Sequence, residues 1–327
     1  MPPTPDPAGL GETLAALPLL VEDVTCEVGS VAVPSFGGAR PTSVVTLRGR
    51  RTMGRGENVA WTEAAQQHFA VHARVAPRGG WRLGDWSAAM REVIAEPYER
   101  AALEAAALDL ALRQVRTSLF DLASVQPSPV RYVVSFGKVA DPVAEAQRHG
   151  EAELKIDVAP EWSDETYHAL AALGRVAILD FKWTGENADH ERVHRLLPTA
   201  LIEDPLPSFD GWSPSLAAQL SFDAPLTAAR ELATLPTRPA FVNLKPGRMG
   251  GVLEVVACAE RCAAEGIGIY VGGMFEVGIG RAQLRTLAAL LSPEGPNDIA
   301  PIGRGNDQPV YPPRLHVSAA PGFGNTA

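Results

Sequence analysis

Short apolar runs recur along the chain from residue 129 onward, and each is followed by a segment whose apolar residues have helical spacing. The runs lie at residues 130–136, 152–158, 176–181, 200–203, 219–222, 240–244 and 266–271, with a weaker candidate near 298–302. Seven or eight strand–helix units in succession are typical of a parallel barrel more than of an open sheet. We therefore expect an α/β fold, a modified (β/α)8 barrel of the TIM type, over residues 126–302.

The chain before this region has a different pattern. Apolar and polar residues alternate over residues 24–45, as in half-buried antiparallel strands, and residues 54–57 (GRGE) interrupt the alternation as a turn does. Helical spacing follows over residues 61–73 and over a long run from 98 to 122. Strands followed by helices predict a separate α+β module over residues 1–125.

Charged residues stand at the C-terminal ends of five successive predicted strands. They are Asp157, Asp180, Glu203, Asp223 and Lys245. In a βα barrel this end of the strands carries the active site. A single charged residue there means little, but five on successive strands predict a functional centre.

Three of these carboxylates, Asp180, Glu203 and Asp223, follow adjacent strands and are expected to point toward one centre. Three like charges at close range need a cation, and ligands that are all oxygen favour a hard ion such as Mg²⁺. Lys245 follows next in the barrel and can serve as a base or as a fixed cation. A metal that binds a substrate carboxylate stabilises the enolate that forms when an α-proton leaves.

Several segments resemble the enolase superfamily, in its muconate-lactonising and o-succinylbenzoate-synthase branch. The best matches are residues 241–251 (FVNLKPGRMGG) and 271–281 (VGGMFEVGIGR), and residues 201–206 (LIEDPL) also resemble a landmark of the family. Residues 54–57 and 103–109 are similar to landmarks of its N-terminal domain. The resemblance implies an α+β capping domain, residues 1–125, over the barrel, and we expect residues 303–327 to pack back on that domain.

The resemblance also implies a site and an activity. It implies Mg²⁺ held by Asp180, Glu203 and Asp223, with Lys245 as an acid/base or enolate-stabilising lysine. It implies a small-molecule carboxylate as substrate, with contacts from Gly273, Met274 and Glu276. The implied activity is that of an o-succinylbenzoate-synthase-like lyase or isomerase, which abstracts the proton α to the carboxylate and stabilises the enolate on the metal.

The sequence departs from the family pattern at three strand ends. The family carries Lys-x-Lys on the second strand, with the second lysine as the usual base, whereas residues 153–157 read ELKID. Lys155 then takes the first position and Asp157 that of the base, although a register shifted by two residues would make Lys155 the base. The third strand ends DFK (180–182) instead of Asp-x-Asn, and the fifth ends DA (223–224) instead of Asp-Glu.

Two of these departures suggest a coupled change. We hypothesise that Lys182 and Asp157 form a charge-swapped pair across neighbouring strand ends. Lys182 is then either a relocated base or an ammonium that takes the place of Mg²⁺, and the raised pKa of a buried ammonium among carboxylates favours the second alternative. The second acid/base group stays open among Lys155, Lys182 and Asp157. A different class of function also stays open, namely a barrel that has lost the family chemistry and binds a ligand without turnover.

Composition limits the partners and the compartment. A net charge of -9 and a pI of about 5.3 argue against nucleic acid and anionic membranes as partners. The three cysteines, Cys26, Cys258 and Cys262, are an odd number that suits a reducing cytoplasm. The seven histidines, His190 and His194 among them, show no metal-binding pattern with an acidic residue, and we expect them to be surface or structural. Barrels of this kind are often symmetric assemblies, so a homo-oligomer is one expectation.

Overall fold

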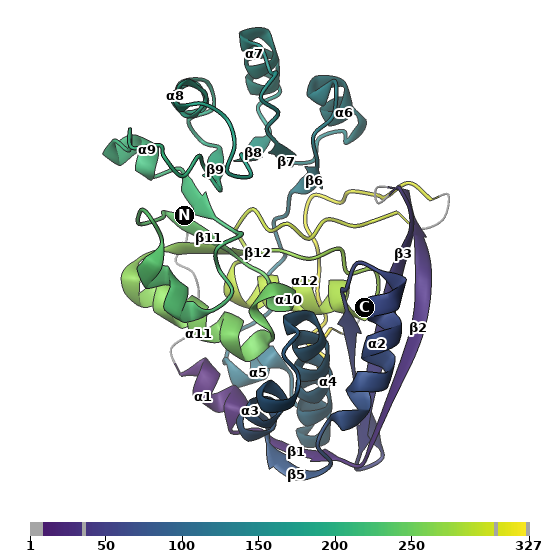
Figure 1. Ribbon diagram of the computed structural model, residues 1–327. Helices are drawn as coiled ribbons and strands as arrows, with labels where there is room; N and C mark the ends of the chain where they lie inside the picture. The colour runs from purple at the N-terminus through teal and green to yellow at the C-terminus, as the bar shows by residue number, and fades with distance from the viewer. Residues whose placement is uncertain (1–8, 35–36, 304–306, 325–327) are drawn as a thin grey trace.

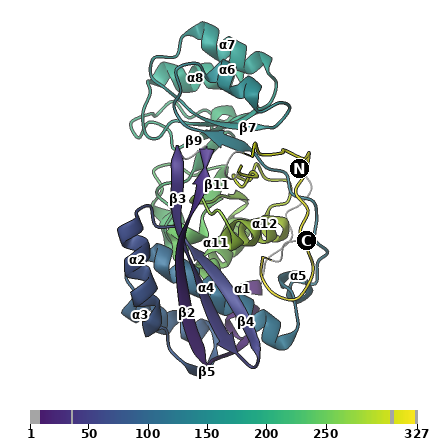
Figure 2. The ribbon, with the colours of Figure 1, turned by 90° about the vertical axis from the view of Figure 1, so that its right-hand side faces the viewer.

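The computed structural model describes residues 9–34, 37–303 and 307–324, which Figures 1 and 2 show in two views. Seven parallel strands form the sheet of the C-terminal part, and they neighbour one another in chain order from β6 to β12. They are β6 (Val134–Phe136), β7 (Leu154–Asp157), β8 (Val176–Asp180), β9 (Leu201–Glu203), β10 (Leu220–Phe222), β11 (Phe241–Leu244) and β12 (Gly268–Val271). The barrel-type fold predicted from the apolar runs is confirmed.

The two edge strands of this sheet are connected through a short segment at the predicted eighth position. Asn297 forms a parallel bridge with Tyr132, just before β6, and Asp298 forms one with Gly272, just after β12. The segment therefore joins the two edges through isolated bridges, without adding a regular strand. This arrangement places Asp298 at the same end of the sheet as the charged strand ends.

Helices connect the strands and pack outside them (Figure 1). They are α6 (Pro142–Arg148), α7 (Asp164–Ala172), α8 (Asn187–Leu196), α9 (Pro214–Ala217), α10 (Pro246–Met249), α11 (Val252–Glu265) and α12 (Ile279–Leu291), with a 3-10 helix (Ala229–Thr234) after β10. Side chains set several of the helix starts: Asp141 accepts from the amide of Ala144, and Ser163 from that of Thr166. Among the described residues, every helix falls short of the length and apolarity that a membrane span requires.

The N-terminal part contains two antiparallel sheets and a group of helices (Figure 2). One sheet joins β2 (Asp23–Val33), β3 (Gly38–Gly49) and β4 (Thr52–Asn58), and the other joins β1 (Pro18–Val21) and β5 (Gly79–Arg82). The helices are α1 (Leu10–Ala15), α2 (Glu63–His72), α3 (Leu83–Val93), α4 (Pro97–Val115) and α5 (Leu119–Leu122), with a 3-10 helix at Ala73–Val75. Alternate side chains of β3 are buried, as the alternating pattern predicted, and α2 and α4 pack against this three-stranded sheet.

The helix expected over residues 98–122 is interrupted. Helix α4 ends at Val115 because Arg116 adopts a left-handed conformation with φ of 59°. A second helix, α5, then begins at Leu119, and the side chains of its N-cap residue Ser118 and of Asp121 form a reciprocal capping box. Apolar spacing continued through this break and concealed it.

The turn expected at residues 54–57 is wrong, because β4 runs straight through these residues. A Cβ on Gly56 would lie 1.9 Å from the carbonyl oxygen of Ala102, and one on Gly54 would lie 2.2 Å from that of Ala106. The glycines are therefore explained by the close approach of the α4 backbone to β4. They mark the contact between a helix and a strand, not a change of chain direction.

Buried carboxylates join the N-terminal part to the barrel. Glu57, at the end of β4, accepts from the backbone amides of Val277, Gly278 and Gly280 at 2.6, 2.8 and 2.9 Å. Glu104, on α4, accepts from the amide of Leu253 at 2.9 Å. These contacts fix β4 against the segment that follows β12, and α4 against the start of α11.

The C-terminal segment also contacts α4. The amide of Phe323 donates to Asp109 Oδ1 at 2.7 Å, and the Phe323 ring is buried. The amide of Gly322 donates to the carbonyl of Thr117 at 3.0 Å. Of the segment 303–327, residues 304–306 and 325–327 lie outside the described residues.

Replacing Gly56 by Ala should destabilise the protein because the new methyl group would overlap the Ala102 carbonyl and force α4 away from β4. Overpacking of this kind costs about 1–3 kcal/mol of unfolding free energy, measurable by urea denaturation. Gly29→Ala is the matched control, since a Cβ at that exposed strand position meets nothing within 4 Å. Equal stability of the two variants would contradict the close helix–strand contact.

Candidate active site

Three buried carboxylates meet at the C-terminal end of the parallel sheet. Asp180 and Glu203 are the last residues of β8 and β9 and pair directly in register, and Asp223 follows β10. The three side chains are almost inaccessible to solvent, and one oxygen from each lies within 4.8 Å of the others. The structure therefore brings together the three residues that were predicted as metal ligands.

Lys155 extends from β7 into the centre of this group. Its Nζ lies 2.6 Å from Glu203 Oε1, 3.3 Å from Asp180 Oδ2 and 3.6 Å from Asp298 Oδ2. Burial opposes the charged form of Lys155, but the attraction of Glu203 and Asp180 is larger in sum and raises the pKa of its ammonium well above the ordinary value. Lys155 is thus a permanent cation shared by carboxylates from three strand positions.

Glu203 is fully buried within the group. Burial, with the nearby charges of Asp180 and Asp223, raises its pKa to about 8 despite the attraction of Lys155. Tyr270 Oη, from β12, donates to Glu203 Oε2 at 2.8 Å and lies 2.8 Å from Ser221 Oγ. Tyr270 and Ser221 had no role in the sequence analysis, since a tyrosine inside an apolar strand reads as core.

Asp223 has two cations of its own. Lys245 Nζ lies 2.7 Å from Asp223 Oδ2, and the guanidinium of Arg248 donates to Asp223 Oδ1. Burial would raise the pKa of this carboxyl, but Lys245, Lys155 and Arg248 together lower it well below its ordinary range. Arg248 was another residue that the sequence analysis missed, although it lies within the family-like segment 241–251.

Lys182 and Asp157 lie side by side at the ends of β8 and β7. Lys182 Nζ is 3.4 Å from Asp157 Oδ1 and also donates to Asp180 Oδ2. Lys182 has a left-handed backbone with φ of 49°, and its side chain is 44% exposed. Burial and the charge of Lys155 lower its pKa, but Asp180 and Asp157 outweigh them and raise it. The geometry agrees with the hypothesised charge-swapped pair.

The position of β7 supports the unshifted register. Asp157 is paired with Asp180, so it stands at the strand end where the family has its base. Glu153 lies before the strand and forms an ion pair with Arg131. A register shifted by two residues would require Glu153 inside the barrel, whereas its side chain is 36% exposed.

The loop after β12 carries the three residues expected to contact substrate. Glu276 is buried and accepts from the amide of Met274 at 2.9 Å, close to Gly273. Arg40 of the N-terminal part donates to the Met274 carbonyl at 3.2 Å. Gly272, the residue before Gly273, leaves space for the Lys245 side chain. A Cβ at Gly272 would lie only 2.8 Å from Lys245 Cε.

An arginine-rich cavity lies next to this centre. It has a volume of about 430 Å³, and Arg248 links it to Asp223. Its charged lining residues are Arg91, Arg100, Arg230, Arg248, Glu96 and Glu254. The excess of guanidinium groups favours an anionic occupant.

The residues of the carboxylate cluster fit a hard divalent cation. Carboxylate oxygens at this spacing are the donors that Mg²⁺ prefers. The centre contains more carboxylates than cations, with Asp157, Asp180, Glu203, Asp204, Asp223 and Asp298 against Lys155, Lys182, Lys245 and Arg248. Asn243 Oδ1, buried near Glu203, also has no hydrogen-bond partner among the described residues.

Replacing Lys155 by Met should destabilise the protein strongly in EDTA, because Asp180, Glu203 and Asp298 lose their shared cation. Breaking a buried ion pair from one side costs about 3–5 kcal/mol of unfolding free energy. Lys245→Met is the matched comparison and should cost less, since Arg248 remains on Asp223. Urea denaturation of both variants measures the difference, and equal losses would show that Lys155 does not hold the cluster together.

Comparisons with known proteins agree with this arrangement. Residues 126–305 match the family model described as the C-terminal domain of a domain of unknown function, DUF8230, and residues 12–122 match the model of its N-terminal domain. An N-succinylamino acid racemase of an Amycolatopsis species is 32% identical over 69% of this chain and 68% of its own length. An o-succinylbenzoate synthase of Geobacillus stearothermophilus is 25% identical over 69% of this chain and 66% of its own length. The chain thus spans about two thirds of these relatives.

A solved structure has the same fold. The dipeptide epimerase of Methylococcus capsulatus, crystallised with Mg and the dipeptide L-Arg-D-Lys, superposes with a TM-score of 0.78 at 19% identity, over 94% of this chain and 99% of its own. The curated relatives are a racemase and a synthase, and the solved structure shares the fold of this chain. The chain is a member of the DUF8230 family and belongs to the enolase superfamily.

Proposed function

We propose that this protein abstracts the proton α to the carboxylate of a small-molecule substrate and then reprotonates the enolate or eliminates from it, as an o-succinylbenzoate-synthase-like lyase or racemase. The observation that carries the proposal is the buried carboxylate cluster with a lysine on either side. Lys245 lies beside Asp223, and the Lys182–Asp157 pair lies beside Asp180. Proton transfer on two faces of one carbon needs two such groups.

Asp180, Glu203 and Asp223 would hold Mg²⁺. When bound, the ion supplies positive charge that stabilises the enolate form of a substrate carboxylate. Lys155 contributes a second positive charge within the cluster, and its contacts with three carboxylates keep its proton in place. It therefore stabilises charge and does not carry a proton.

Lys245 and Lys182 differ in the direction in which each would move a proton. Lys182 has two carboxylate neighbours that keep it protonated, so it suits the role of donor. Lys245 shares its single carboxylate with Arg248, which still neutralises Asp223 when Lys245 is an amine. We assign Lys245 as the acceptor of the α-proton and Lys182 as the donor to the opposite face, with Asp157 positioning Lys182.

The substrate we propose is an N-acylated amino acid whose acyl group ends in a second carboxylate. The N-succinylamino acid named for the Amycolatopsis relative is of this class. The cavity with four arginines next to Asp223 supports a second anionic group on the substrate. Bidentate contacts with guanidinium groups would orient such a group.

Lys245→Ala should abolish exchange of the α-proton with solvent deuterium, followed by NMR on N-succinylamino acids. Lys182→Met should retain exchange on one face but lose inversion, because the acceptor remains while the opposite donor is gone. Circular dichroism of the product distinguishes exchange from inversion. Full exchange in Lys245→Ala would mean that the acceptor has been misassigned.

Mg²⁺ should raise the thermal unfolding midpoint of the wild-type protein relative to EDTA. A site filled at 100 times its dissociation constant adds about 2.7 kcal/mol, which moves the midpoint by several degrees. Asp180→Asn should lose the shift. Lys182→Met should bind Mg²⁺ more tightly, because the ammonium no longer competes for Asp180. Unchanged midpoints in both wild type and Lys182→Met would contradict a metal centre.

A second candidate function rests on a specific observation. Each of the three carboxylates already contacts a lysine of the protein, so the cluster is held together without an added ion. This observation favours a barrel that binds a carboxylate ligand without turnover. Ligand-induced stabilisation with no α-proton exchange in any carboxylate of a panel would support it, and one positive exchange would exclude it.

A further inference from the structure

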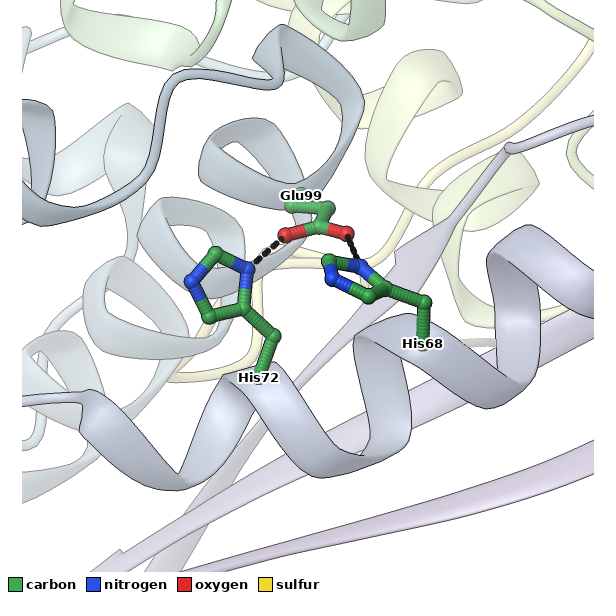
Figure 3. A group of neighbouring side chains, drawn as sticks. All are labelled: His68, His72 and Glu99. Atoms are coloured by element: carbon green, nitrogen blue, oxygen red, sulfur yellow. Dashed lines mark hydrogen bonds and ion pairs between the residues drawn. The ribbon is translucent and has the colours of Figure 1, made fainter.

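Two histidines and a glutamate form a separate cluster in the N-terminal part (Figure 3). His68 and His72 lie one turn apart on α2, and Glu99 lies in the first turn of α4. His68 Nδ1 is 3.0 Å from Glu99 Oε1, and His72 Nδ1 is 2.7 Å from Glu99 Oε2. The expectation that the histidines form no metal-binding pattern with an acidic residue is wrong for this pair, since the fold supplies the acid from 27 residues away.

The Glu99 carboxylate lies in a confined environment. Glu99 is 4% exposed, and within the described parts of the chain its hydrogen-bond partners are the two imidazoles. A buried carboxylate is more stable with a cation beside it, and both imidazoles present ring nitrogens to the same place.

The donor atoms have the kind and spacing of a metal site. The three ligand atoms lie within 4.8 Å of one another. Ligands about 2.0–2.1 Å from a tetrahedral zinc ion stand roughly 3.3 Å apart, so the two nitrogens would move away from the carboxylate oxygens by a few tenths of an ångström. His68 permits this movement because its side chain is 67% exposed. The same exposure leaves an open side for water as a further ligand.

The chemistry of this donor set differs from that of the barrel. Imidazole nitrogens favour Zn²⁺, Co²⁺ and Ni²⁺ over Mg²⁺, whereas the barrel cluster offers carboxylate oxygens. Cys26, on β2, lies in the field of Glu99: burial, then the charges of Glu27 and Glu99, raise the pKa of its thiol to about 12. The Cys26 thiol lies outside the group of three ligand atoms and is not counted as a ligand.

We propose that His68, His72 and Glu99 form a binding site for one transition-metal ion of the Zn²⁺ type, which fastens α2 to α4. Few side chains hold α2 otherwise, since Gln66 and Phe69 are its buried residues. The helix begins two residues after Trp61, whose ring packs on Phe275 at a centroid distance of 5.7 Å. A metal at this site would thus steady the part of the capping domain that contacts the loop after β12.

The test is a titration of the full-length protein with Co²⁺ in excess Mg²⁺, followed by visible absorption and equilibrium dialysis. Mg²⁺ occupies sites that are all oxygen and leaves imidazole sites free. We expect one tightly bound Co²⁺ per chain, displaced by Zn²⁺, and a rise in the thermal midpoint with Zn²⁺. His68→Gln and His72→Gln should weaken Co²⁺ binding by more than about tenfold, the loss that removal of even an outer-shell partner causes.

Two controls separate this site from adventitious binding. His168→Gln removes an exposed histidine of α7, and Cys26→Ser removes the neighbouring thiol. Both should bind Co²⁺ as the wild type does. His68→Gln alters an exposed side chain, so loss of binding there with an unchanged midpoint in EDTA reports on ligation and not on folding. Co²⁺ binding that is absent in the wild type, or equal in all variants, would overturn the proposal.

Discussion

The ammonium of Lys155 is the contact on which the centre of the barrel depends. Acids at neighbouring strand ends repel one another, and a buried group of them would force the strands apart or stay protonated. One lysine reaches Asp180, Glu203 and Asp298 at once and offsets that repulsion from inside the barrel. The same lysine therefore allows the strands to align in register and allows the carboxylates to lie close together.

Much of this arrangement follows from patterns that are local in the sequence. Acids at the ends of apolar runs predict a site because parallel strands end at one edge of the barrel, and Asp180 and Glu203 lie there in register. The central position of Lys155 is harder to predict. The pattern of apolar residues does not show how far its long side chain extends or which acids it contacts. The turn predicted at residues 54–57 and the missed helix break at residue 116 were errors of a related kind. A glycine that admits a helix backbone and a glycine in a turn look alike, and helical spacing can continue across a residue with positive φ.

Other functional contacts depend on pairs that are distant in the chain. In the sequence Tyr270 looks like a core residue, and only the fold shows that its hydroxyl donates to Glu203. Glu99 looks like an acid at a helix N-terminus, and only the fold brings the two imidazoles of α2 to it. The Lys182–Asp157 pair could be predicted from the sequence, because both residues depart from the family pattern and stand at the ends of adjacent strands. The two residues carry opposite charges at neighbouring strand ends and lie 3.4 Å apart, so each charge offsets the other within one cavity.

Glu57 has a consequence for how substrate enters. Its carboxylate accepts hydrogen bonds from the amides of Val277, Gly278 and Gly280, where the loop after β12 enters α12. A hydrogen bond to a charged group contributes about 1.5–3 kcal/mol. The capping domain is thus anchored to the very loop that carries Met274 and Glu276. A rigid-body opening of the two parts would have to break these bonds together, so access is left to side-chain and short-loop rearrangements at the rim. At this contact the capping domain and the barrel are held together as one unit.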